Sequence, residues 1–105
     1  MYTKGRYIIQ MIISFNDSET EKIFYQEFSK RIPIDLHKIA LRKLMMINAA
    51  TSLLDLKVPP GNHLEQLTGN RAGQWSIRIN KQWRIVFVPV NGGRDYQNVS
   101  IVDYH

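Results

Sequence analysis

Two neighbouring segments of the sequence alternate apolar and polar side chains, and this pattern constrains the fold more than any other feature of the chain. In residues 74–80, Trp75, Ile77 and Ile79 alternate with polar or charged residues, which is typical of a strand with one buried and one open face. In residues 83–90, apolar side chains occupy both parities, which favours a more central strand. The two segments therefore predict an antiparallel β-hairpin.

The phase of the alternation predicts the register of this hairpin, because side chains directly opposite in an antiparallel pair point to the same face. A three-residue loop over 80–82 places Ile77 opposite Ile85 on the apolar face. The same loop places Arg78 opposite Arg84 on the other face. A two-residue loop mixes these arginines with the isoleucines, so we expect the loop of odd length.

Two arginines that face each other repel unless a negative group lies between them, and two explanations for such a pair are open. A structural explanation needs a carboxylate from another part of the chain, and Asp103 is a candidate. A functional explanation is an external anion, most naturally a phosphate, whose oxygens match the planar donors of guanidinium groups. We favour the phosphate.

Two helices are expected before the hairpin. Ser18, followed three residues later by Glu21, has the spacing of a capping box and predicts a helix over residues 18–30. Asp35 is the expected cap of a second helix, which ends at about residue 50 and carries one apolar stripe. Further strands are expected over 7–15, 64–68 and 97–104, and turns over 69–73 and 91–95.

The length and composition of the chain limit its partners and location. At 105 residues the chain is expected to form a single domain, residues 1–105. Lys and Arg number 14 against 9 Asp and Glu, and this net charge of +5 favours a polyanionic partner, with nucleic acid ahead of a membrane surface. The absence of Cys excludes disulfides and fits a reducing, cytoplasmic location. No apolar run approaches the roughly 18 residues that span a bilayer, so we expect no membrane partner.

The sequence contains no pattern for a metal or a nucleotide cofactor. His37 and His63 have no second histidine or carboxylate at ligand spacing, so we expect no metal site. Gly69 and Gly73 have the spacing of turn residues and not that of a phosphate-binding loop. We therefore expect a protein that works without a cofactor.

Three stretches of the sequence together resemble one known family. They are LLDLKVPPGNHLEQL over 53–67, LTGNRAGQWSIRINKQWRIVF over 67–87, and the terminal VDYH over 102–105. They resemble the HigB toxins of bacterial type II toxin–antitoxin systems, within the RelE/ParE superfamily, over nearly the whole chain from Met11 to His105. The resemblance implies an α+β, microbial-RNase-like fold, in which two N-terminal helices pack on a small antiparallel β-sheet. It leaves residues 1–10 as a possible N-terminal extension.

The resemblance also implies a function and a set of partners. Proteins of this family are ribosome-dependent endoribonucleases that cut mRNA during translation, so the chain is expected to be an mRNA interferase that inhibits translation. A HigA-like helix-turn-helix antitoxin neutralises such a toxin. Operator DNA is then bound only through the toxin–antitoxin complex.

By motif match, the resemblance carries over four site residues, which are Arg84, Asp103, Tyr104 and His105. RNA cleavage without a metal uses the ribose 2′-OH as nucleophile, so the site must move protons and stabilise a charged phosphorane. Arg78 and Arg84 are expected to hold the scissile phosphate, and His105 to transfer a proton. Asp103 shares the strand parity of His105 and is expected to orient its imidazole or to act as the base. Tyr104 points the other way in a regular strand, and is expected to stack on a base or bind a phosphate after a twist.

Other cations and two other function classes complete the sequence-based picture. Arg71, Lys81 and Lys57 are expected to bind RNA outside the scissile phosphate. Trp75 and Trp83 share the parity of the core isoleucines, so we expect them in the core. The chain is alternatively a non-catalytic toxin of the same superfamily that inhibits DNA gyrase, or a basic RNA-binding module. The terminal Asp-Tyr-His and the paired arginines argue against the gyrase inhibitor.

Overall fold

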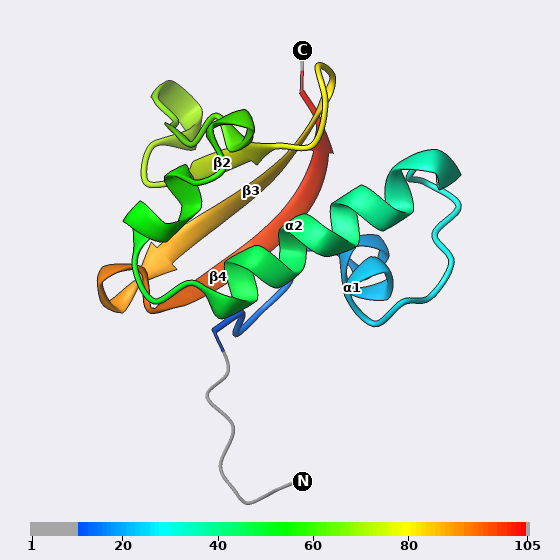
Figure 1. Cartoon of the computed structure of the whole chain (residues 1–105), viewed down its shortest axis with the longest axis horizontal. Coiled ribbons are helices and arrows are strands. Elements are labelled where there is room, and N and C mark those ends of the chain that lie inside the picture. Colours follow the sequence, from blue (N-terminus) through cyan, green and yellow to red (C-terminus); the bar gives the residue numbers. More distant parts are fainter. Residues whose placement is uncertain (1–10, 105) are drawn as a thin grey trace, which may run out of the picture.

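The computed structural model describes residues 11–104, and within them two α-helices precede a four-stranded antiparallel sheet (Figure 1). The α+β class expected from the sequence is confirmed. The sheet has the strand order β1-β2-β3-β4, so each strand pairs with its neighbour in the sequence. The elements are α1 (Ser18–Phe24), α2 (His37–Ala49), β1 (Glu65–Gln66), β2 (Trp75–Arg78), β3 (Trp83–Val90) and β4 (Asp95–Asp103).

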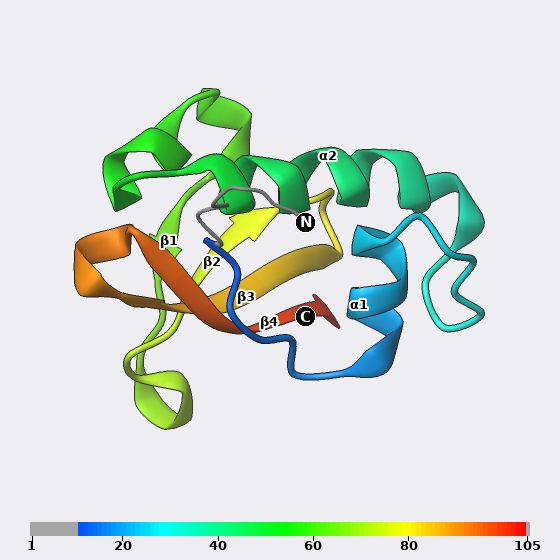
Figure 2. The same cartoon turned by 90° about the horizontal axis from the view of Figure 1, so that it is seen from below.

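The hydrophobic core lies between α2 and one face of the sheet, and α1 lies beside α2 and β4 (Figures 1 and 2). The apolar stripe of α2 meets the strand side chains that alternate inward, as helix and strand periodicities require. Trp83 belongs to this core, which confirms the expectation for it, while Trp75 is partly buried and packs against the core. Fully buried side chains on the two sides include Ala40, Leu44, Ile47, Ile77, Ile85, Phe87 and Ile101.

The hairpin has the register that the sequence predicts. Ile77 pairs with Ile85, and Arg78 pairs with Arg84. The loop keeps three residues, because the backbone N–H of Ile79 donates to the carbonyl of Trp83 at 2.9 Å. The Asn80 carboxamide oxygen accepts from the backbone N–H groups of Gln82 and Trp83, at 2.8 and 2.7 Å, and closes the turn.

The first helix differs from the expectation at both ends. Asp17, and not Ser18, caps α1: its carboxylate accepts from the backbone N–H of Thr20 at 3.0 Å. Both residue types are good caps, and here the charged acceptor one position earlier is the one used. The helix ends at Phe24 and not at residue 30, because Gln26 takes a left-handed backbone conformation with φ 64°.

The second helix and the first strand also need correction. A 3-10 turn, η1 (Ile34–Leu36), precedes α2, and α2 starts without a side-chain cap, so Asp35 is not its N-cap. The possible extension 1–10 lies outside the described residues, and so does the first part of the expected strand 7–15. Residues 11–15 run parallel to β4 through two isolated bridges, Ile12 to Tyr96 and Phe15 to Val99.

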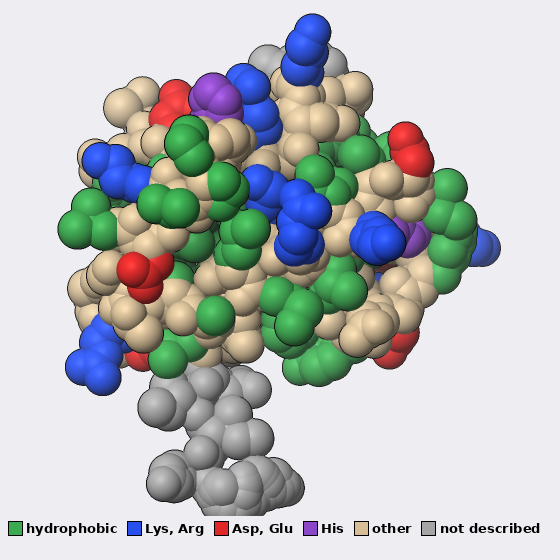
Figure 3. Space-filling view, in the orientation of Figure 1, with side chains coloured by type: hydrophobic (Ala, Val, Ile, Leu, Met, Phe, Trp, Pro, Cys, Tyr) green, Lys and Arg blue, Asp and Glu red, His purple; other side chains and the backbone are tan. Residues whose placement is uncertain are grey.

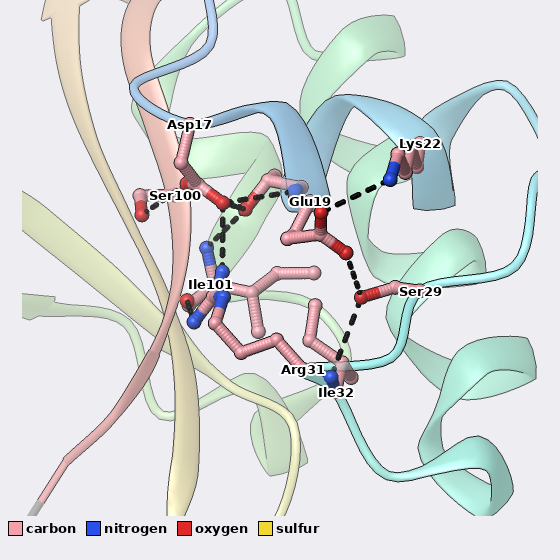
Figure 4. Close-up of polar contacts among 9 residues, drawn as sticks. Asp17, Glu19, Lys22, Ser29, Arg31, Ile32, Ser100 and Ile101 are labelled. Carbon is pink, nitrogen blue, oxygen red and sulfur yellow. Dashed lines mark hydrogen bonds and ion pairs between the residues drawn. The ribbon is translucent and has the colours of Figure 1, made fainter.

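Asp17 ties α1 to the last strand and to the loop that follows the helix (Figure 4). Its carboxylate accepts from the Ser100 hydroxyl at 2.7 Å and from Arg31 Nη2 at 2.7 Å. Arg31 Nη1 in turn donates to the backbone carbonyl of Ile101 at 3.3 Å. Burial acts to raise the pKa of Asp17, but the hydrogen bonds from Ser100 and Thr20, with the charge of Arg31, outweigh it and hold the pKa below its ordinary value.

We predict that Asp17→Ala lowers the free energy of unfolding by about 2–3 kcal/mol, since it removes both the helix cap and the bonds to β4. Because the folded pKa of Asp17 is depressed, its contribution is complete well above the ordinary value of 3.8 and is lost as the pH falls through the lower folded value. Urea unfolding of the wild type, Asp17→Ala and Asp17→Asn at pH 7 and pH 3 measures this. The difference between wild type and variants is expected to shrink at pH 3, and a constant difference would contradict the assignment. The exposed Asp35→Asn serves as the control.

Candidate functional site

The facing arginines lie on the sheet face opposite α2, but this face is less open than the sequence predicts. Arg84 is only 7% exposed, and Ser76 and Val86 on the same face are also buried. His63 and Glu65 both contact the Arg84 side chain, so the segment that carries β1 covers this part of the sheet. The expectation of a fully open face is therefore wrong at Arg84.

Several groups fix the guanidinium of Arg84 in one orientation. Its Nε donates to the Ser76 hydroxyl at 2.7 Å, and its Nη2 donates to the backbone carbonyl of His63 at 2.7 Å. The Tyr104 ring centroid lies 5.7 Å from its Cζ atom, within the range of a cation–π contact. A planar donor that is held in this way needs no reorganisation before it binds an anion.

The carboxylate nearest to the arginine pair belongs to Glu65 and not to Asp103. Glu65 Oε1 lies 3.6 Å from Arg84 Nη2, and its side chain is largely exposed. Burial, the largest influence, and then the neighbouring Arg78 lower the pKa of Arg84, while Glu65 and Tyr104 act to raise it. A single exposed carboxylate does not balance two guanidinium groups, so the site remains electropositive.

Arg78 adds a donor that the described residues leave unused. Within residues 11–104, its Nε atom is buried and has no hydrogen-bond partner. A buried unsatisfied donor is unfavourable, and in a native protein it calls for an explanation such as a ligand acceptor. Together with the pairing to Arg84, this favours an anion between the two arginines.

The C-terminal residues lie on alternate faces of the sheet. Asp103 pairs with Trp83 and accepts from Gln82 Nε2 at 3.1 Å, so it lies on the face away from Arg84. Tyr104 follows Asp103 and reaches Arg84, while its backbone N–H donates to the carbonyl of Gln82 at 2.6 Å. The structure therefore brings Tyr104 to the arginine pair, without a twist, and places Asp103 on the other side. His105 lies outside the described residues.

His63 is the site residue that the sequence analysis missed. Its Nε2 atom lies 3.5 Å from Arg78 Nη1, and its backbone carbonyl anchors Arg84. The side chain is exposed, and the backbone is left-handed, with φ 46°. In the sequence, His63 lacks a second metal ligand at suitable spacing and has no other predicted role. The sequence feature that could have indicated a role for His63 is its position in the turn-forming stretch PPGNHLEQL, where it does not contribute to a pattern of buried apolar residues.

A buried contact holds the loop that carries His63. Lys43 of α2 is 4% exposed, and its ammonium donates to the carboxamide oxygen of Asn62. The Asn62 amide nitrogen donates to the backbone carbonyls of Leu56 and Val58, at 3.1 and 3.4 Å. Burial, and then the charge of Arg42, lower the pKa of Lys43. These bonds fix the loop against α2, directly before His63.

The remaining cations that the sequence analysis selected lie on three separate segments. Arg71 ends the 3-10 turn η4 (Gly69–Arg71), Lys57 ends η2 (Leu53–Lys57), and Lys81 lies in the hairpin loop. All three are exposed. Lys and Arg side chains also gather over α2 among hydrophobic side chains (Figure 3). Positive charge is thus spread over the surface, and Arg78 and Arg84 are set apart by their close pairing.

The described part of the chain offers neither a metal-binding cluster nor a membrane-spanning helix. Residues 11–104 contain no group of three or more His, Cys, Asp or Glu side chains placed to hold a metal ion. None of the helices in this range has the length and apolar character of a membrane span.

The fold has a counterpart among solved structures. A YoeB/ParE toxin from Agrobacterium tumefaciens matches with a TM-score of 0.50 at 19% sequence identity, over 90% of this chain and 97% of that one. This likeness concerns the fold alone. It defines the fold class of the chain as the one that this YoeB/ParE toxin has.

The sequence comparisons identify the family within this class. A family model described as RelE-like toxin of type II toxin-antitoxin system HigB matches residues 13–105. Toxin HigB-1 of Vibrio cholerae serotype O1 is 40% identical over 83 residues, which cover 78% of this chain and 87% of the relative. Endoribonuclease HigB of Proteus vulgaris is 33% identical over 96 residues, or 90% of this chain and 100% of the relative. The chain belongs to the HigB family of type II toxins, as its resemblance indicated, and the family implies an antitoxin partner.

Proposed function

We propose that the chain is a metal-independent endoribonuclease that cuts mRNA on the ribosome and so inhibits translation. The observation that carries this proposal is the pairing of Arg78 with Arg84 beside His63 and Tyr104. The name of the Proteus vulgaris relative, Endoribonuclease HigB, supports the same reaction class.

The reaction needs charge stabilisation, which the arginines supply. The ribose 2′-OH loses a proton and attacks the adjacent phosphorus, a pentacoordinate phosphorane forms, and the 5′-oxygen leaves with a proton. Arg84, held by Ser76 and the His63 carbonyl, and the partly buried guanidinium of Arg78 donate to the phosphorane oxygens. Guanidinium groups suit this task because they are planar and stay charged.

The reaction also needs two proton transfers. We assign one to His63, whose exposed imidazole lies next to Arg78. The other is assigned to His105, which the family motif selects. Asp103 pairs with Trp83 on the opposite face of the sheet, so the expected role of orienting the imidazole at the arginine pair is not proposed for it. Tyr104, against Arg84, is proposed to hold a base or a phosphate oxygen. Arg71, Lys81 and Lys57 are proposed to contact neighbouring phosphates.

The ribosome has a physical role in this proposal. Among the described residues, His63 is the one imidazole beside the arginine pair. Positioning of the mRNA backbone by the ribosome then supplies a contribution that reaches several orders of magnitude in rate. We propose that a HigA-like helix-turn-helix antitoxin neutralises the chain in the cytoplasm, and that operator DNA is bound only through that complex.

Induced expression with mapping of mRNA 5′-ends tests the proposal. The wild type is expected to arrest growth and to produce cuts within translated reading frames. In vitro, purified protein is expected to cut ribosome-bound mRNA far faster than naked RNA of the same sequence. Growth arrest without mRNA cuts would instead favour the gyrase inhibitor, and RNA binding without cuts would favour the RNA-binding module. Equal rates on naked and translated RNA would reject the role of the ribosome.

A further inference from the structure

A hollow lies on the sheet face that carries the arginine pair. It is a cavity of about 190 Å³. Side-chain amides, valines, a guanidinium group and a hydroxyl line this cavity. The lining residues are Asn16, Gln74, Asn98, Val86, Val102, Arg71 and Ser100.

The strand registers connect this cavity to Arg84. Val86 lies two residues beyond Arg84 on β3, about 7 Å along the strand on the same face. Val102 pairs with Arg84, and Ser100 pairs with Val86. Gln74 shares the face parity of Ser76, which binds Arg84 Nε. The cavity therefore adjoins the proposed cleavage site at a spacing suited to the next nucleotide of an RNA strand.

The chain is bent locally to bring the amides to this cavity. The ladder between β3 and β4 shifts its register between Val86 and Val88, and Asn98 there has a left-handed backbone, with φ 55°. Its backbone N–H leaves the β3–β4 ladder and donates to the Ser14 hydroxyl at 2.9 Å. Arg71 Nη1 donates to the Gln74 side-chain oxygen at 3.1 Å and orients that amide.

The chemistry of the lining selects a flat ligand with polar edges. Val86 and Val102 supply the apolar part of the lining, which suits the face of an aromatic ring. The carboxamides of Asn16 and Asn98 offer both donors and an acceptor, and Gln74, whose oxygen accepts from Arg71, offers its NH₂ donors. Such groups match the edge of a nucleobase. A phosphate alone makes no use of the valines.

We propose that this cavity binds one nucleobase of the RNA, adjacent to the scissile phosphate, and reads its edge through Gln74 and Asn98. The inference rests on the proposed function and adds to it a site of base selection. It gives the toxin a sequence preference of its own within the codons that the ribosome presents.

Mapping of cleavage sites in Gln74→Ala and Asn98→Gly tests this proposal. Glycine accepts the left-handed backbone of position 98, so the second variant removes the amide without strain. The wild type is expected to prefer one base at a fixed position beside the cut. Each variant is expected to reduce that preference about tenfold, as measured from 5′-end frequencies in a translating extract. Asn70→Ala is the matched control, because Asn70 carries an exposed amide in the turn η4, next to Arg71, and does not line the cavity. This variant is expected to keep the wild-type preference.

The outcomes separate this inference from the proposed function. Wild-type cutting with a base preference that both variants retain overturns the base site and leaves the nuclease intact. Wild-type cutting without any base preference beside the cut also overturns it. Absence of cutting by the wild type rejects the nuclease and the base site together. Thermal melting of each variant shows whether it is folded, and Asn16→Ala is the substitute if one is not.

Discussion

Arg84→Ala is expected to cut ribosome-bound mRNA about 100- to 1,000-fold more slowly than the wild type, and its expression is expected to permit growth. The reason is that the Arg84 guanidinium is held in place by Ser76 and the His63 carbonyl and faces Arg78 across the ladder. Loss of one pre-oriented donor to a developing oxyanion has an effect of this size. Single-turnover cleavage with excess toxin measures the chemical step directly.

Two controls separate this effect from loss of structure. Arg84 is 7% exposed, so its removal also leaves the Ser76 and His63 groups without a donor and lowers stability by about 1–3 kcal/mol. Arg84→Lys keeps the charge without the planar fork and is expected to be folded yet strongly impaired. Arg94→Ala, an exposed arginine directly before β4, is expected to cut like the wild type. A folded Arg84→Ala protein that cuts within about threefold of the wild-type rate would show that the pair is only structural.

The hairpin register could be predicted because it depends on local sequence alone. Because side chains alternate faces along a strand, the loop length alone decides which residues face each other in the hairpin. Only a loop of odd length places Ile77 opposite Ile85. The facing of Arg78 and Arg84 follows from that choice without further information. This half of the site is therefore a consequence of one segment of the sequence.

The other half of the site depends on long-range geometry that parity does not give. The β3–β4 pairing shifts its register between Val86 and Val88. Because of this shift, simple alternation from the β3–β4 turn does not predict on which face Asp103 and Tyr104 lie, and only the observed pairs show it. His63 and Glu65 reach the arginines because the segment before β2 folds back along it, and no periodic pattern in that segment predicts this. The helix cap shows a smaller limit, since Asp17 and Ser18 are adjacent residues of equal propensity.

His63→Asn is expected to lower the rate of RNA cleavage about 100- to 10,000-fold, the range for loss of a general acid or base. Asparagine tolerates the left-handed backbone at this position, and the backbone carbonyl that anchors Arg84 remains in any variant. The loss is therefore expected in the maximal rate, while the KM for ribosome-bound mRNA stays close to the wild-type value. His37→Asn, which removes a histidine of α2, is the control and is expected to cut normally once folding is verified.

Chemical rescue distinguishes proton transfer by His63 from a positioning role. His63→Gly also fits the left-handed backbone and leaves an open space beside Arg78. Imidazole added to this variant is expected to restore part of the cleavage rate in proportion to its concentration, because the diffusible base replaces the missing ring. A structural role for the ring predicts no such recovery. If His63→Asn cuts at the wild-type rate, the proton transfers fall to His105 alone, and the exposed imidazole beside Arg78 has no part in the chemistry.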